Sequence, residues 1–515
     1  MTEVSKIMSI PEPQHTADHG TPRPGYRCGQ FVLGPVGTSG PEDWRSYVIT
    51  EDLVLVARLD LNVTCVAADG RALTLIGFML DPRVPEATDL AILRKLLAQD
   101  ISMAELGARA GSYGGRWALV ATRGEERYLV TDTLGMRQVF YTNRSSIGTV
   151  YAMSEPGSGA QMLGLQPDPE AAAYAATVGC ADPEYRWPVD ATAFREIRKL
   201  LPNHYLDLRD GVAIRFWPHG PLVPRSVNQC VEEVAPLIKG MLAAAANRYE
   251  LAVAVTAGID SRVVLAACRD IKERLRFVTV KQWHARQDHP DLQVATVLLK
   301  HLGLPHDVVQ ATAPTSSDFR SVYKASVFGA HDHYAPDAEA ILRYYNRERV
   351  TVTGSGGEIG RCPFREYLPL FDRKRVTPAY LSKIAIGRVH PFAERYFAQW
   401  MATLGADRTV NALDLFEWEQ ECGSWIAMTA LEFDIAWKDI FTPFNCRDVL
   451  VAMLATPPRC RKALEYGLFH KIAAALWPET LDLPVNPHRS LSSVKRYLRG
   501  ANELLRHAAR YLRYH

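Results

Sequence analysis

Residues 251–267 read LAVAVTAGIDSRVVLAA. Leu251–Val255 is a short apolar run rich in valine, which predicts a buried parallel strand. Thr256–Ser261 predicts a tight polar turn, and apolar residues at helical spacing resume at Arg262. A strand, a turn with glycine and hydroxyls, and a helix together favour phosphate binding, because backbone N–H groups and the positive end of the helix dipole point at the anion.

The turn supplies residue types that suit a nucleotide. Gly258 can take a positive φ, Thr256 carries a hydroxyl, and Asp260 is a hard oxygen ligand suited to Mg²⁺. The spacing of a Walker A loop is absent, and an ordinary strand-turn-helix of an α/β sheet is the alternative. The predicted nucleotide-binding segment comprises Val255, Thr256, Ala257, Gly258, Ile259, Asp260 and Ser261.

This turn resembles the pyrophosphate loop of the ATP pyrophosphatases, whose usual form is Ser-Gly-Gly-x-Asp-Ser. Within that superfamily the chain is similar to the asparagine synthetase and β-lactam synthetase family, which includes the lasso-peptide macrolactam synthetases. Thr256 replaces the first serine and keeps a hydroxyl, whereas Ala257 replaces a glycine. The resemblance implies that the strand Leu275–Val280 holds the adenine at its edge, near Val280.

A second glycine-rich loop follows the predicted strand Val350–Thr353. It resembles the family's second phosphate-side loop, Ser-Gly-x-Gly-x-Asp-Glu, and Glu358 falls where the family has a Mg²⁺-binding Asp. Two such loops at the carboxyl ends of parallel strands should meet in one crevice, so Asp260 and Glu358 are expected to share a Mg²⁺ ion. The nucleotide-binding residues predicted in this loop are Gly354, Ser355, Gly356 and Gly357.

Length and composition indicate at least two domains, because 515 residues exceed an ordinary single core. A net charge of +2 does not suggest a nucleic-acid binder, and no apolar run reaches membrane-spanning length. The nine cysteines are scattered without a C-x-x-C pair, which favours a reducing cytoplasm. We expect a loose extension over 1–29, a first domain over 30–217, a linker over 218–226 and a synthetase domain over 227–515.

The first domain reads as strand after strand, with a helix from Ala87 to Gln99. Gly115–Ala118 and Leu129–Tyr141 resemble segments of the N-terminal amidohydrolase (Ntn) domain of glutamine-dependent asparagine synthetases. Active members expose a cysteine directly after the initiator Met, but this chain begins Met1-Thr2, and Cys28 would need proteolytic unmasking. The expected fold class is therefore α/β: an inactive Ntn-like α+β sandwich, then a doubly wound parallel sheet of the adenine-nucleotide α-hydrolase type, with a helical C-terminal part.

The C-terminal region departs from the family pattern. Leu413–Phe441 predicts one long helical stretch, and Thr442–Arg447 resembles the family's Val-Pro-Phe-Leu-Asp position. The family's catalytic Lys context, Arg-x-Lys-x-Gly-Phe, is absent, and Arg489 or Lys495 is the expected substitute. The basic helix expected over 495–515 suits a homodimer or a partner protein, and His331-Asp-His333 is expected to be an exposed loop pair.

The resemblance implies a ligase that adenylates a substrate carboxylate with ATP and Mg²⁺, releases pyrophosphate, and transfers the acyl group to an amine. The missing nucleophile indicates tailoring of a small molecule or peptide instead of glutamine-dependent synthesis. A catalytically degenerate nucleotide-binding scaffold and an asparagine synthetase that uses free ammonia remain the alternatives.

Overall fold

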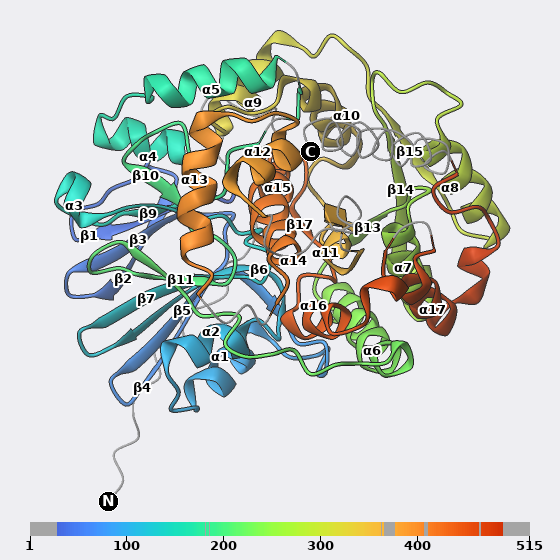
Figure 1. Cartoon of the computed structure of the whole chain (residues 1–515), viewed down its shortest axis with the longest axis horizontal. Helices are drawn as coiled ribbons and strands as arrows, with labels where there is room; N and C mark the ends of the chain where they lie inside the picture. Colours follow the sequence, from blue (N-terminus) through green and yellow to red (C-terminus); the bar gives the residue numbers. More distant parts are fainter. Residues whose placement is uncertain are drawn as a thin grey trace, which may run out of the picture.

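The computed structural model describes residues 28–487 except 181, 185, 362, 365–375, 406–409, 463 and 464. Almost all of the expected extension 1–29 lies outside the described residues, as do Arg489, Lys495 and the expected basic helix. The antiparallel strands lie in the left half of Figure 1 and the parallel strands β13 to β15 in the right half. The mixed α/β class predicted from the sequence is confirmed at this level.

Two six-stranded antiparallel sheets form the first part of the chain. Their facing sides alternate apolar residues, which build a core between the sheets from Phe31, Leu33, Leu55, Ile76, Leu129 and Leu206. The first sheet has the order β10 (Ile197–Lys199), β8 (Phe140–Thr142), β9 (Ala152–Met153), β1 (Phe31–Pro35), β3 (Leu53–Arg58) and β2 (Trp44–Thr50). The second has the order β12 (Val212–Arg215), β11 (His204–Asp207), β7 (Glu126–Thr131), β6 (Gly114–Arg123), β5 (Arg71–Leu80) and β4 (Val63–Ala68).

Local signals in this part act as the sequence predicts. Asp69 and Gly70 both have positive φ, 53° and 69°, as a tight hairpin turn between β4 and β5 requires. The Thr88 hydroxyl accepts from the Ala91 N–H and so caps the predicted helix at its first turn. The helices here are α1 (Asp89–Leu97), α2 (Met103–Ala110), α3 (Arg144–Ile147), α4 (Pro156–Leu163) and α5 (Pro169–Gly179).

The third sheet is parallel and carries the glycine loops. Its order is β15 (Asp307–Gln310), β14 (Leu275–Lys281), β13 (Leu251–Ala254), β16 (Val350–Val352) and β17 (Asp439–Phe441). The chain runs outward from β13 to β15 and returns to β16 on the other side, so the strand order reverses between β13 and β16. In open α/β sheets this reversal leaves a crevice outside the carboxyl ends of the strands.

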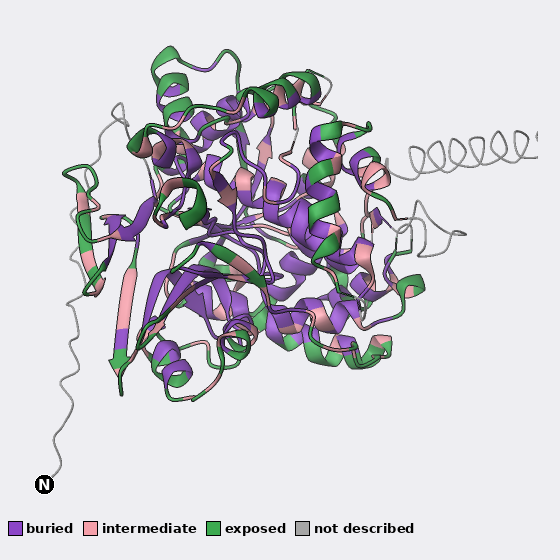
Figure 2. Cartoon of the chain, turned by 60° about the vertical axis from the view of Figure 1, so that its left-hand side comes forward, coloured by how far each residue is buried: buried purple, intermediate pink, exposed green. Residues whose placement is uncertain are grey.

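Helices surround this sheet, and their buried faces join its core (Figure 2). No helix or strand interrupts the expected linker 218–226, because β12 ends at Arg215 and α6 begins at Val227. The α-helices are α6 (Val227–Ala246), α7 (Ile259–Ala267), α8 (Pro290–His301), α9 (Ser317–Ser326), α10 (Ala335–Tyr345), α11 (Gly357–Arg361), α12 (Pro378–Ile386), α13 (Pro391–Ala402), α14 (Ala412–Phe416), α15 (Ala427–Phe433), α16 (Arg447–Leu454) and α17 (Gly467–Leu476). Short 3-10 helices are η1 (Arg269–Arg274), η2 (Asp332–Tyr334), η6 (Pro458–Cys460) and η7 (Pro478–Leu481).

The single helix expected from Leu413 to Phe441 is wrong. Helix α14 continues into a π-helix, η5 (Glu417–Ile426), and then into α15, which ends at Phe433. Asp439–Phe441 instead forms β17 and pairs in parallel with β16, Val352 lying opposite Phe441. Only five residues separate this three-residue strand from the end of α15, and so short a run cannot be distinguished from a continuing helix by its pattern.

A buried cluster of charges joins the antiparallel part to the parallel sheet. Arg116 on β6 is 1% exposed and donates to Asp434 at 2.5 Å and to Asp439 at 3.0 Å. Arg137 donates to the other oxygen of Asp439 at 2.6 Å. Although burial opposes ionisation of Asp439, the two guanidinium groups outweigh it and lower its pKa. Each buried charge therefore has a partner from the other half of the chain.

Candidate functional site

The two glycine loops meet where the strand order reverses. Gly354 follows β16 and packs on the first turn of α7 so closely that an added Cβ would lie 2.9 Å from the Asp260 carbonyl carbon. A Cβ added to Gly357 would lie 2.6 Å from Asp260 Oδ1. Both positions therefore exclude any larger side chain unless the loops move. The expected convergence of the loops is present in the structure.

Arg361 lies between the two carboxylates expected to hold Mg²⁺. Its Nη2 is 3.0 Å from Asp260 Oδ2 and 3.2 Å from Glu358 Oε1. The side chains of Arg361 and Asp260 are only 11% and 12% exposed. Burial opposes the charge on Arg361, but Asp260 and Glu358 outweigh it and raise the guanidinium pKa. One cation thus already joins the two carboxylates.

The turn after β13 binds an anion of the protein itself. The Ala257 N–H donates to Asp291 Oδ1 at 2.9 Å, from the first turn of α8. The Gly258 N–H donates to the Thr256 hydroxyl at 3.1 Å, and the hydroxyls of Thr256 and Ser261 lie 3.0 Å apart. The Asp291 carboxylate therefore accepts from a backbone N–H of the kind that binds phosphate oxygens at helix N-termini.

Two details of this turn differ from the prediction. Gly258 has φ −72°, so the turn does not use the positive φ that a glycine permits there. Helix α7 begins at Ile259 and not at Arg262, which places Asp260 and Ser261 in its first turn. The Ser261 hydroxyl donates to the Gly258 carbonyl at 2.9 Å and stabilises the tight turn without a left-handed residue.

The last described segment lies against the same turn. The buried Arg262 guanidinium donates to the carbonyls of Thr480 at 2.6 Å and Pro484 at 3.1 Å. The Asn486 N–H donates to the Ala257 carbonyl at 3.0 Å. Arg489, the proposed catalytic residue, follows three positions later, outside the described residues.

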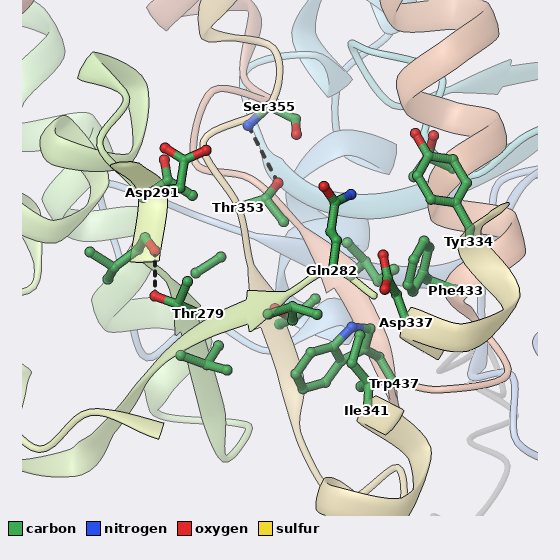
Figure 3. Close-up of a pocket in the computed structure, with 18 of the residues that line it drawn as sticks. Thr279, Gln282, Asp291, Tyr334, Asp337, Ile341, Thr353, Ser355, Phe433 and Trp437 are labelled. Atoms are coloured by element: carbon green, nitrogen blue, oxygen red, sulfur yellow. Dashed lines mark hydrogen bonds between the residues drawn. The ribbon is translucent and has the colours of Figure 1, made fainter. Parts of the chain in front are cut away.

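A cavity of about 390 Å³ opens beside the loops (Figure 3). Its polar end is formed by the carboxyl ends of β13, β14 and β16 and includes Thr256, Asp291, Thr353 and Ser355. Its apolar end lies against α10 and the end of α15, and includes Tyr334, Asp337, Ile341, Phe433 and Trp437.

The predicted residues divide around this cavity. Val255, Thr256, Val280 and Ser355 line it, whereas Ile259 is fully buried in the core. The remaining predicted residues lie in the loops around the Arg361 contact: Ala257, Gly258, Asp260, Ser261, Gly354, Gly356, Gly357 and Glu358. Among the glycines of the second loop, Gly356 alone has a positive φ, 89°.

Sequence reasoning missed three charged residues here: Asp291 as a partner of the turn, Arg361 and Asp337. The spacing of Glu358 and Arg361, three residues apart on α11, is the one local signal for an ion pair. Asp291 reaches the turn, and Asp337 the cavity, only through tertiary packing, which the sequence pattern does not report.

The π-helix η5 places further acids near the second loop. Glu417 is buried, and burial together with the charges of Glu421 and Glu358 raises its pKa well above the usual range. Glu421 pairs with Arg186 at 3.0 Å.

No metal cluster is apparent elsewhere: the described residues contain no group of three or more His, Cys, Asp and Glu that could hold an ion. The expectation that His331 and His333 form an exposed loop pair is wrong, since the His333 side chain is only 17% exposed and His331 is buried. The Nδ1 atom of His331 lies 2.7 Å from Glu432 Oε1. The bond fixes the imidazole inside the core.

The antiparallel part shows no exposed thiol at its first strand. Cys28 is 4% exposed, and burial raises its pKa to about 12. A thiol held in that state is a poor nucleophile near neutral pH. Thr2 lies outside the described residues.

Comparisons with known proteins leave the family open. No protein-family model and no curated protein sequence matches the chain. A solved structure described as the allosteric regulatory enzyme of purine biosynthesis is similar over 60% of this chain and 74% of its own, with 11% identity and a TM-score of 0.25. Glutamine phosphoribosylpyrophosphate amidotransferase from B. subtilis, complexed with ADP and GMP, is similar over 65% and 72%, with 9% identity and a TM-score of 0.24. At these values the likeness decides neither fold nor function.

In the described part of the chain, no helix is long and apolar enough to cross a membrane.

Proposed function

We propose that the chain is an ATP-dependent ligase that adenylates a substrate carboxylate and joins the acyl group to an amine. The observation that supports it best is the meeting of two glycine loops at the point where the strand order reverses. There Asp260 and Glu358 both pair with the guanidinium of Arg361. Ligands of open α/β sheets bind at this position. We further propose that the enzyme is cytoplasmic, that its substrate is a small molecule or peptide, and that glutamine does not supply the nitrogen.

The residues present fit a magnesium–nucleotide complex in their charges. Asp260 and Glu358 already share a cation, and the Ala257 N–H already holds an acidic oxygen. Mg²⁺ usually takes one or two protein carboxylates plus phosphates and water, so two carboxylates suffice. Bound there, it would neutralise charge on the phosphates.

The chain's own groups have separate tasks in this proposal. The N–H groups of the turn after β13 and the N-terminus of α7 orient the phosphates and stabilise the leaving pyrophosphate. The edge of β14 at Val280 positions the adenine. Arg361 now pairs with both carboxylates and would contact the phosphates if a metal ion took its place between them. The proposed tail residues Arg489 and Lys495 would stabilise charge on the reacting acyl group.

The test is exchange of labelled pyrophosphate into ATP over a panel of carboxylates, with ATP binding measured in parallel. Asp260→Asn and Glu358→Gln should each lower exchange at least 100-fold, since each removes a ligand charge. Asp318→Asn on α9, which is exposed and remote, should not. Full exchange by Asp260→Asn would refute the metal assignment.

A nucleotide-binding protein without catalysis is the second candidate. Asp291 occupies the backbone donor of Ala257, and Arg361 occupies the carboxylate of Asp260. ATP and its metal ion must displace both side chains, which favours this candidate. Tight ATP binding with no exchange for any carboxylate or for aspartate with free ammonia would support this candidate.

A further inference from the structure

The apolar end of the cavity has one charged group that the nucleotide does not need. Asp337, in the first turn of α10, is 3% exposed and lines the cavity. Around it lie Tyr334, Ile341, Phe433 and Trp437, and Figure 3 shows these side chains together on one side of the cavity. A buried carboxylate in such surroundings is expensive unless a cation or hydrogen bonds offset its desolvation.

The protein offsets this charge only weakly. The Trp283 N–H donates to Asp337 Oδ1 at 3.4 Å, at the long limit of a hydrogen bond. The Gln282 amide and the charge of His333 act on the carboxylate as well, yet burial dominates and raises its pKa to about 6. No arginine or lysine of the described chain forms an ion pair with Asp337, although Lys281 lines the same cavity. The carboxylate therefore stays ionised near pH 7 with no strong partner.

We propose that this end of the cavity binds the amine substrate, and that the amine is carried on an apolar, ring-bearing body. That the bound amine is a substrate rests on the proposed ligase function. That an amine binds here does not depend on that function. An ammonium group supplies the charge that Asp337 lacks, and the aromatic side chains both bury an apolar body and attract a cation through their rings.

Other occupants fit this end less well. A carboxylate substrate would face the like charge of Asp337, which costs free energy in a cavity of low polarity. Adenine is neutral and is expected at the edge of β14, by Val280, where it leaves Asp337 without a cation. A small polar amine such as ammonia would leave the apolar walls unfilled.

Three probes that share a phenylethyl body and differ in their end group test the assignment by calorimetry: phenethylamine, 2-phenylethanol and 3-phenylpropionate. The full-length chain should bind the amine at least tenfold more tightly than the alcohol, with the acid weakest. Asp337→Asn should reduce the amine to the affinity of the alcohol and leave ATP affinity unchanged. Asp318→Asn serves as the matched control and should keep the amine preference.

An amine affinity that Asp337→Asn leaves unchanged would overturn the proposal. So would a variant that loses discrimination between ATP and GTP while its amine binding persists, since Asp337 would then contact the base. Ile341→Trp, which fills the cavity without touching the charge, should weaken all three probes together; unchanged binding would place the amine elsewhere. A preference for the amine without pyrophosphate exchange would refute the ligase function but support the amine site. Pyrophosphate exchange without a preference for the amine would refute the amine site alone.

Discussion

Replacement of Arg361 by Met should create a divalent-cation site that needs no nucleotide. The change removes the guanidinium that bridges Asp260 and Glu358 at 3.0 and 3.2 Å, and Met keeps most of the side-chain volume. It therefore takes one positive charge away from two carboxylates whose side chains are 12% and 28% exposed.

The size of the effect follows from this geometry. A unit pair at about 4 Å interacts by about 4 kcal/mol when the effective dielectric constant is about 20. Removal of one partner from a buried pair costs about 3–5 kcal/mol. Because Glu358 is 28% exposed, the lower end is appropriate, and about 3 kcal/mol corresponds to roughly a 100-fold gain in cation affinity.

Binding of Mn²⁺ to the nucleotide-free protein, followed by electron paramagnetic resonance, measures this gain directly. Wild type should bind Mn²⁺ weakly and Arg361→Met about 100-fold more tightly. The double variant Arg361→Met, Glu358→Gln should lose the gain. Arg343→Met removes an exposed charge from an i,i+4 pair on α10 and should behave as wild type. Equal Mn²⁺ affinity in wild type and Arg361→Met would show that the two carboxylates do not form a cation site.

Three further changes test other contacts. Asp291→Asn should tighten ATP binding several-fold in a fluorescent-nucleotide titration, because the charge that competes for the Ala257 N–H is removed; weaker binding would contradict this. Lys199 is buried, and burial lowers its pKa to about 7, so Lys199→Met should raise the melting temperature at pH 6. The gain should fade as the pH rises from about 7 to about 10.4, where the unfolded chain also loses the proton, and an equal gain at both ends of that range would exclude the charge as its cause. Arg116→Met should destabilise the protein by about 3–5 kcal/mol by leaving Asp434 unpaired, and a loss below about 1 kcal/mol in urea unfolding would rule out the buried charge as a stabiliser.

Sequence patterns predicted the parts of this molecule that depend on local rules. The valine-rich run at Leu251 and the Asp69-Gly70 turn give strand and hairpin directly, because apolar periodicity and positive-φ preference act within a few residues. The meeting of the two loops followed from one further rule, that parallel strands end at one edge of a sheet. The order of the strands then brings Asp260 and Glu358 together.

What the patterns could not predict depends on packing between distant segments. Arg361, Asp291 and Asp337 acquire their roles from neighbours that the fold brings close, at separations of up to about a hundred residues. Glycine at position 258 permits a positive φ but does not require one, and the Ser261 hydroxyl donates to its carbonyl while its backbone is extended. The conformation of this glycine therefore depends on a hydrogen bond that its own residue type does not predict.

The buried charges between the two halves give the antiparallel part a use that needs no chemistry of its own. Asp434 directly follows Phe433 in the chain, and Asp439 comes two positions after Trp437, so Arg116 and Arg137 brace the stretch that walls the apolar end of the cavity. Deletion of residues 1–217 would remove Arg116 and Arg137, and so the partners of Asp434 and Asp439. The stretch that forms this wall of the cavity would then be less well ordered.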